Sequence, residues 1–184
     1  REALFLVNFD GVGHSYEFLF FAIEGALCAF LAVLFMRSIL ASAKLASRSG
    51  IHKMLQPMLA GLILGMLALV FPDVLGIGRE TLRFATIEGA FEMSELVLLF
   101  SIKMLVTALC IGFGFAGGVF SPALLIGILF GAWYGSAVAY LLPEYFSSIE
   151  VYAVCGMMAL TSAVIGAPLT TIIIVFELTR NYDL

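Results

Sequence analysis

The residues with the most specific chemistry lie in a glycine-rich turn inside a long uncharged stretch. Residues 112–122 read Gly-Phe-Gly-Phe-Ala-Gly-Gly-Val-Phe-Ser-Pro, and residues 104–143 contain no Lys, Arg, Asp or Glu. Glycine frees the backbone, Ser121 is a suitable N-cap, and Pro122 suits the first turn of a helix. The pattern predicts that one helix ends near Gly112 and that another begins at Ser121.

A helix that begins at this turn presents backbone N–H groups without partners inside the helix. Lipid cannot satisfy them, and each unpaired group costs several kcal/mol. An anion is a natural acceptor because the helix dipole places about half a positive charge there, although water or a carbonyl group of another helix would also serve. The candidate anion-binding residues are Gly117, Gly118, Val119, Phe120, Ser121 and Pro122. Without a nearby basic residue the binding should be modest, as an ion that must also leave requires.

The composition places this turn in an all-α integral membrane protein. Hydrophobic residues make up 62% of the 184 residues and charged residues only 12%, and the mean hydropathy is +1.12. These values exclude a disordered tail, a nucleic-acid-binding arm and a disulfide-stapled secreted domain. The length allows about six helical passages or half-passages at about 20 residues per full span.

The gaps between charged residues predict the positions of the helices. Membrane spans are expected over residues 15–44, 53–71, 95–112 and 121–142, with an amphipathic interfacial piece over 80–91. The uncharged stretch 104–143 cannot be one helix, because its 40 residues would extend about 60 Å across a hydrocarbon core of about 30 Å.

A second interrupted element follows near the end of the chain. A short helix over 151–161 is expected to break at Gly166-Ala167-Pro168 and to continue as a half-helix over 169–178. Short apolar segments interrupted by Gly and Pro are the best sequence pointer to the binding site of a transporter.

Small residues predict two close helix contacts. Gly61 and Gly65 have the GxxxG spacing of a packing interface, and Gly127, Gly131 and Gly135 form one small face of a later helix.

Four basic residues predict the orientation in the membrane. Arg37, Lys44, Arg48 and Lys53 lie together, and no acidic residue occurs over 25–72. Because short cytoplasmic loops carry an excess of Lys and Arg, this loop is expected in the cytoplasm and the first helix is expected to start outside.

Five polar or aromatic side chains lie within the predicted spans. Glu24 is expected to make an interfacial or helix–helix contact rather than to relay protons. Lys103 should snorkel or pair with a glutamate. Glu177 reads as structural, and Trp133 and Tyr134 either pack inside the protein or mark the membrane interface.

Cysteine and histidine do not indicate a metal centre. Cys28, Cys110 and Cys155 lie in apolar stretches and are expected to be free thiols. His14 and His52 are far apart in the sequence, so no metal site is predicted.

Two motifs carry a resemblance to a known family. Gly117-Gly118-Val119-Phe120-Ser121-Pro122 matches the GxFxP signature of the CLC chloride channel and transporter family. Residues 166–171, Gly-Ala-Pro-Leu-Thr-Thr, resemble a later turn of that family, which opens an apolar helix ending in Glu-Leu-Thr, here residues 177–179. The resemblance covers essentially the whole chain. It implies one half of an inverted-repeat CLC transmembrane domain, with residues 1–184 as the second, C-terminal half, incomplete at both ends.

The resemblance also implies a function. In the family, backbone N–H groups of the x and F positions of GxFxP help to bind chloride, which points to Val119 and Phe120. Chloride is then the bound substrate ion, no cofactor is needed, and the protein is not an enzyme. Homodimers are usual in the family, and the helix after Pro168 resembles one at that interface. The location would be the plasma (inner) membrane.

Two departures from the family pattern bear on this expectation. The family's GSGIP and GxExP loops belong to the first half and are absent here, so this chain alone is expected to lack a complete ion pathway. Phe113 and Phe115 stand where small or polar residues are common in the family, which leaves the surroundings of the turn open.

Other functions remain to be weighed. Residues 112–117 match GxGxxG literally, but an apolar helix precedes them and the next acid is Glu144, so a dinucleotide site is not expected. An intramembrane hydrolase with Ser121 or Ser162 as nucleophile would need a base within reach, and the uncharged stretches hold no His or Asp. A broken-helix carrier for organic solutes is a further alternative. Within the leading hypothesis, a passive channel and a proton-coupled exchanger both stay open.

Overall fold

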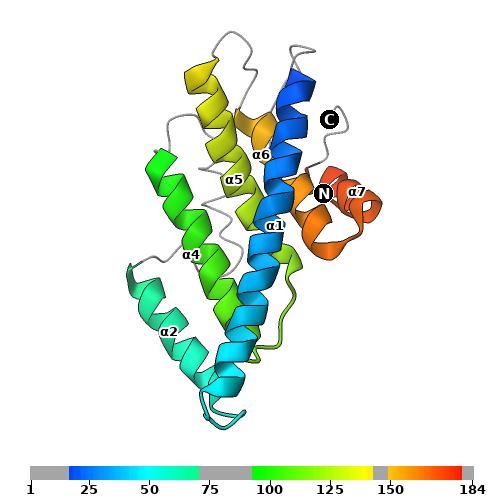
Figure 1. The fold of residues 1–184 in the computed structure, drawn as a ribbon. Helices are drawn as coiled ribbons and strands as arrows, with labels where there is room; N and C mark the ends of the chain where they lie inside the picture. The colour runs from blue at the N-terminus through cyan, green and yellow to red at the C-terminus, as the bar shows by residue number, and fades with distance from the viewer. Residues whose placement is uncertain (1–16, 71–92, 143–148, 180–184) are drawn as a thin grey trace.

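The computed structural model describes residues 17–70, 93–142 and 149–179. These residues form helices and connecting turns and contain no strand, so the all-α prediction is confirmed (Figure 1). The helices are α1 (Glu17–Arg48), α2 (Gln56–Val70), α4 (Met93–Gly112), α5 (Phe120–Leu141), α6 (Ile149–Ile165) and α7 (Pro168–Thr179).

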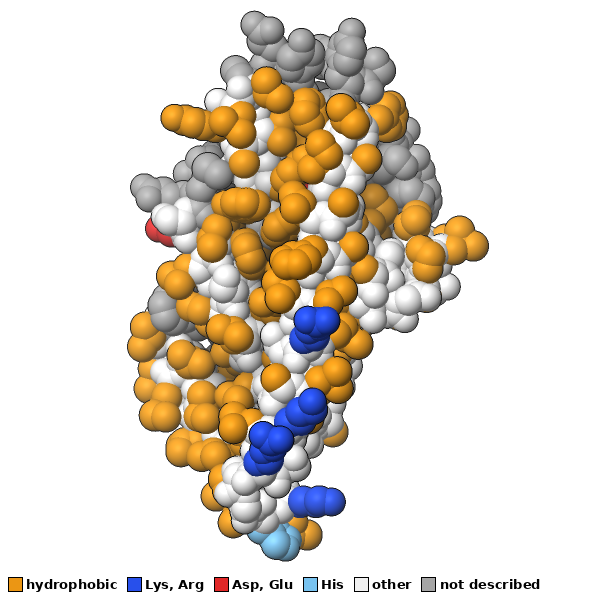
Figure 2. All heavy atoms as spheres, viewed as in Figure 1, with side chains coloured by type: hydrophobic (Ala, Val, Ile, Leu, Met, Phe, Trp, Pro, Cys, Tyr) orange, Lys and Arg blue, Asp and Glu red, His pale blue; other side chains and the backbone are white. Residues whose placement is uncertain are grey.

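Three of these helices are long and apolar enough to cross a membrane. They are Phe18–Arg48 within α1, Ser94–Gly112 within α4, and α5. Large apolar side chains lie exposed on the outer helices, for example Phe30 at 65% and Leu69 at 87%. Figure 2 shows such side chains over most of one face of the bundle. A surface of this kind is expected where a helix faces lipid instead of water.

The predicted helix bounds agree with the structure to within a few residues. The largest differences are at the C-terminal ends of α1, which continues past Lys44 to Arg48, and of α6, which continues past the expected end at Thr161 as far as Ile165. Gly166 then adopts φ +74°, and its N–H donates to Ser162 O at 2.9 Å, as in a left-handed helix C-cap. The expected amphipathic piece over 80–91 lies outside the described residues.

The centre of the fold is a close contact between α5 and α6. A Cβ atom added to Gly127 would lie 2.8 Å from Met157 Cα, and one added to Gly131 would lie 2.8 Å from Ala153 Cα. Gly156 makes the same kind of contact from α6, because a Cβ atom added to it would lie 2.8 Å from Gly131 Cα. Backbones this close leave no room for side chains, so the predicted small face is confirmed as the packing surface of α5.

The Gly61–Gly65 prediction is wrong as a helix–helix interface among the described residues. An added Cβ on Gly61 would meet the Phe115 ring at 3.4 Å, whereas one on Gly65 would meet nothing within 4 Å. The reason is that Gly61 faces the connection after α4, whereas Gly65, one turn later, is exposed and has no described residue within reach. Gly112 makes the tighter contact, since its added Cβ would lie 2.7 Å from Ala43 N of α1.

Three interior side chains resolve expectations that the sequence left open. The Tyr134 hydroxyl donates to Phe20 O at 2.8 Å, and the rings of Trp133 and Phe130 are 5.7 Å apart, so both aromatic residues pack inside the protein. Lys103 is only 7% exposed, and its side chain therefore stays within the bundle instead of snorkelling to the surface.

The cysteine expectation also holds within the described chain. All three cysteines are free, and Cys28 is fully buried. The described residues contain no group of three His, Cys, Asp or Glu side chains that could hold a metal ion.

The α5–α6 contact yields a stability prediction for the full-length protein. Gly131→Ala should lower the free energy of unfolding by about 1–3 kcal/mol, because the added methyl group would collide with the backbone of α6. Thermal unfolding in detergent would measure the loss. The control, Gly65→Ala, meets no neighbour and should leave stability unchanged or slightly raised. Equal effects of the two substitutions would contradict the packing account.

Candidate functional site

A connection over residues 113–119 carries the chain from the end of α4 to the start of α5. At the end of α4, the Gly114 N–H donates to Ile111 O at 3.1 Å and the Phe115 N–H donates to Cys110 O at 3.0 Å. Gly114 adopts φ +95°, a backbone conformation that favours glycine. In Figure 1 this connection rises from the lower end of α4, so that α5 begins within the height of the bundle.

Two phenylalanines that depart from the family pattern anchor this connection. Phe113 is 5% exposed and packs with Ala46 of α1 and Ala60 of α2. The Phe115 ring lies against Gly61 of α2. Sequence reasoning marked both residues but did not assign them this role. The sequence feature that could have predicted this packing is the presence of large apolar rings inside a glycine-rich turn.

The first turn of α5 differs from the prediction by one residue. The helix begins at Phe120, and Val119 occupies the N-cap position with φ −87° and ψ −7° and without a side-chain hydrogen bond. Ser121 is therefore the second residue of the helix and not its N-cap. The reason is that Val119 already has helical backbone angles, so its carbonyl accepts the Ala123 N–H at 3.0 Å. Pro122 lies in the first turn, as predicted.

A run of backbone N–H groups at this helix start has no acceptor. From Ala116 to Ser121, no N–H group donates to any residue in the described part of the chain, and Pro122 has no N–H to donate. These six consecutive donors lie at an accessible position, since Ala116, Gly117, Gly118 and Ser121 are exposed. In a membrane protein they need acceptors from water, a ligand or another part of the protein.

The six predicted binding residues form this same segment, and space lies in front of it. Gly117 and Gly118 are exposed, and an added Cβ on either would meet nothing within 4 Å. Val119 and Phe120 are half-buried. The first turn of α5 contains no acidic residue, so nothing in that turn opposes the positive end of the helix dipole.

The second helix break, between α6 and α7, lies where it was predicted but leaves fewer free N–H groups than the first break. α7 begins at Pro168, one residue before the expected start, and the Thr171 N–H donates to Ala167 O at 3.0 Å. Proline at the first helical position leaves fewer free N–H groups than α5 has. This turn redirects the chain after α6, whereas the turn before α5 offers donors.

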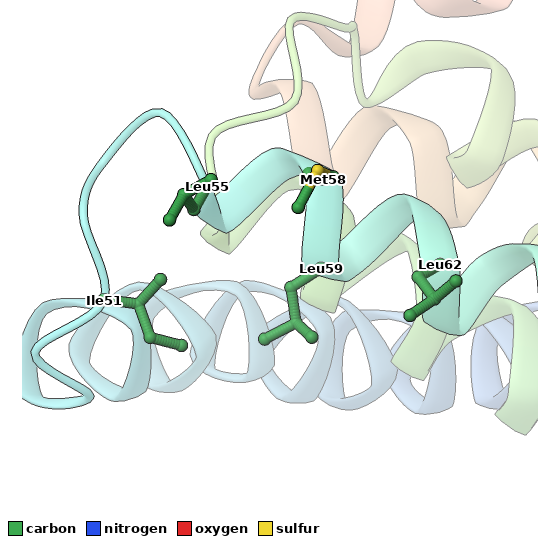
Figure 3. Close-up of a pocket in the computed structure, with 5 residues that line it drawn as sticks. All are labelled: Ile51, Leu55, Met58, Leu59 and Leu62. Carbon is green, nitrogen blue, oxygen red and sulfur yellow. The ribbon is translucent and has the colours of Figure 1, made fainter.

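Neither an apolar pocket nor a serine offers a competing active site in the described residues. The pocket of about 380 Å³ beside α2 is lined by apolar side chains, namely Ile51, Leu55, Met58, Leu59 and Leu62 (Figure 3). It therefore lacks polar side chains that would orient a polar substrate. No described His, Asp or Glu side chain is hydrogen-bonded to Ser121 or Ser162, so the geometry gives no activated nucleophile.

Comparison with known proteins decides the family. The sequence profile of a family described as "Voltage gated chloride channel" matches residues 2–184. The chain belongs to the voltage-gated chloride channel family. It is therefore an integral, multi-pass membrane protein of all-α fold.

The chain is similar to longer proteins of this chloride channel family. Proteins named "H(+)/Cl(-) exchange transporter ClcA" from Salmonella arizonae and Salmonella newport are 38% identical over 124 residues, which is 67% of this chain and 26% of each relative. A solved structure titled as a slow cyanobacterial Cl-/H+ antiporter is 28% identical with a TM-score of 0.85. It matches 100% of this chain and 43% of its own. The chain thus matches about a quarter of the length of these curated relatives.

The geometry of the connection between α4 and α5 predicts which of its glycines tolerate a side chain. Gly117→Ala should leave the unfolding temperature of the full-length protein unchanged, because its methyl group would enter open space. Gly114→Ala should cost about 1–2 kcal/mol, because φ is +95° there. A thermal melt of both variants in detergent tests this pair. A destabilised Gly117→Ala would show that the space before α5 is filled by protein.

Proposed function

We propose that this chain supplies part of a chloride site in the second half of a CLC transmembrane domain. The unbonded N–H groups of residues 116–121 carry the proposal. A halide accepts several N–H donors at once and has no preferred direction for them. The helix dipole of α5 adds favourable charge without a fixed cation.

Within this site, each residue has a distinct role. The N–H groups of Val119 and Phe120 donate to chloride, with the Ser121 N–H beside them. Gly117 and Gly118 keep the approach open because they carry no side chain. Pro122 contributes no donor and starts the hydrogen-bonded part of α5. Chloride is the substrate ion, and the site needs no cofactor.

The names of the relatives support transport over the alternative functions. They are called H(+)/Cl(-) exchange transporters and a Cl-/H+ antiporter, which favours proton-coupled exchange over a passive channel. Neither a serine hydrolase nor a carrier for organic solutes gains support from them. The remaining walls of the ion pathway would come from a first half that carries the family's other loops.

The charge distribution supports an orientation. Arg37, Lys44, Arg48 and Lys53 are all exposed, and Figure 2 shows the blue side chains along the lower part of the molecule. We assign this end to the cytoplasm because short cytoplasmic loops are rich in Lys and Arg. α1 then starts on the outer side of a plasma (inner) membrane.

The exposed face of α7 supports a homodimer. Leu169 is 72% exposed and Ile173 is 59% exposed, one turn apart on the same helix. A second copy of the chain would cover these apolar side chains. Each subunit would keep its own ion site, because α5 lies in the centre of the fold and α7 at its side (Figure 1).

Chloride flux from liposomes containing the full-length protein tests the site. Gly118→Leu should reduce flux at least tenfold, because its side chain would occupy the space in front of the α5 amides. The matched control, Gly65→Leu on α2, also enters open space and should retain wild-type flux. Unchanged flux and anion selectivity in Gly118→Leu would count against the site.

The proposed dimer has its own test. Ile173→Trp should shift the full-length protein toward monomers in lipid, because the larger ring disturbs a fitted apolar interface. Leu62→Trp, at a position of similar exposure on α2 (61%), should leave the dimer intact. Single-molecule photobleaching in liposomes counts the subunits. Equal subunit numbers for both variants and the wild type would argue against α7 as the interface.

A further inference from the structure

An acidic side chain lies buried at the junction of three helices. Glu24 of α1 is 1% exposed, although its helix crosses the membrane and α1 exposes many apolar residues. Its Oε1 atom would lie 3.0 Å from a Cβ added to Gly156 of α6. The absence of a side chain on Gly156 therefore makes the room that Glu24 occupies.

Neither carboxyl oxygen of Glu24 has a hydrogen-bond partner in the described part of the chain. Two neighbouring donors are directed elsewhere: the Sγ of Cys28, one turn along α1, donates to Gly156 O at 4.0 Å, and the Tyr134 hydroxyl donates to Phe20 O at 2.8 Å. Neither of these donors is directed to the Glu24 carboxyl group. An ionised carboxylate in this position would be both desolvated and unpaired.

The titratable groups around Glu24 do not supply a positive charge. Cys28 comes from α1, Tyr134 from α5, and Tyr152 and Cys155 from α6. Thiols and phenols of this kind are neutral at pH 7 in their ordinary state. None of these four groups can balance a carboxylate.

The buried lysine of α4 lies at a different height. Gly112 of α4 packs against Ser42 and Ala43 of α1, and both helices descend in Figure 1. Lys103 is therefore level with about residue 33 of α1, which lies about 14 Å along the axis from Glu24 at roughly 1.5 Å per residue.

A metal ion does not fit the site either. Hard cations require about six oxygen ligands, and the described residues contain no cluster of three metal-binding side chains. The ligand that a lone carboxylate can take up without further partners or space is a proton.

We propose that Glu24 is a proton-binding site, which holds one proton at neutral pH in the contact between α1, α5 and α6. Gly156, which faces Glu24, also packs against Gly127 and Gly131 of α5. The proton on Glu24 thus stabilises the packing that fixes α5. The proposal does not depend on chloride binding, and its tests do not measure transport.

Infrared spectroscopy of the full-length protein tests the proton directly. At pH 7 the wild type should show the carbonyl band of a protonated carboxylic acid, and Glu24→Gln should lose it. Glu177→Gln removes an exposed carboxylate of α7 and should leave that band in place. A wild type without the band, or a band that persists in Glu24→Gln, would overturn the proposal.

The pH dependence of unfolding is a second test. The folded wild type would keep a proton that Glu24 releases on unfolding, so its stability should fall with rising pH relative to Glu24→Gln. The expected relative change is about tenfold in the unfolding equilibrium for each pH unit between about 5.5 and 7, where unfolded Glu24 is ionised and folded Glu24 keeps its proton. Glu177→Gln should follow the wild-type curve.

The opposite outcome is equally specific. A constant difference between wild type and Glu24→Gln across this range, or a wild type that gains relative stability with pH, would mean that Glu24 is ionised in the folded protein. If Glu24→Gln does not fold, Glu24→Met fills a similar volume without titrating and replaces it in both measurements.

Discussion

A helix that begins inside a bilayer must find acceptors for its first backbone N–H groups, because hydrocarbon offers none. In this chain the connection before α5 adds further N–H groups that need acceptors, since the N–H groups from Ala116 to Ser121 all lack acceptors in the described residues. Proline at 122 removes a further donor and lets the regular hydrogen bonding start at Ala123. The charge of the helix dipole then makes an anion the best partner for the remaining groups.

The rest of the fold holds these donors in position. α5 approaches α6 so closely at Gly127 and Gly131 that neither position can carry a side chain. The connection itself is fixed at its other end by Phe113, which is buried between α1 and α2. A site made of backbone groups depends on such packing, because no side chain can rotate to improve the fit. Gly156, which makes this contact from α6, also faces Glu24, so the proposed proton site lies beside the α5–α6 contact and not at the start of α5.

The sequence predicted the parts of this structure that local chemistry determines. Glycine and proline place the breaks near 112–122 and 166–168 because they act on their own backbone. The N-cap prediction at Ser121 failed because Val119 takes helical angles, which side-chain preference does not reveal. The packing of Gly65 and the burial of Glu24 depend on which helix lies opposite, and a single sequence does not contain that information. The packing of Phe115 could not be predicted for the same reason, since its partner Gly61 comes from another helix.

The central claim is that chloride binds to backbone N–H groups at the start of α5. Replacing the amide between Val119 and Phe120 by an ester removes the Phe120 N–H and keeps the side chain, and chloride titration calorimetry on the full-length protein measures the effect. The ester also weakens the Val119 carbonyl as the acceptor of the Ala123 N–H, so a second replacement that removes that hydrogen bond is the control. Loss of the Phe120 N–H should weaken chloride binding about tenfold, or about 1.5 kcal/mol. The same replacement at Ala123, whose N–H already donates to Val119 O, should leave the chloride affinity unchanged. Wild-type affinity in the Phe120 ester, or an equal loss in both esters, would contradict the account.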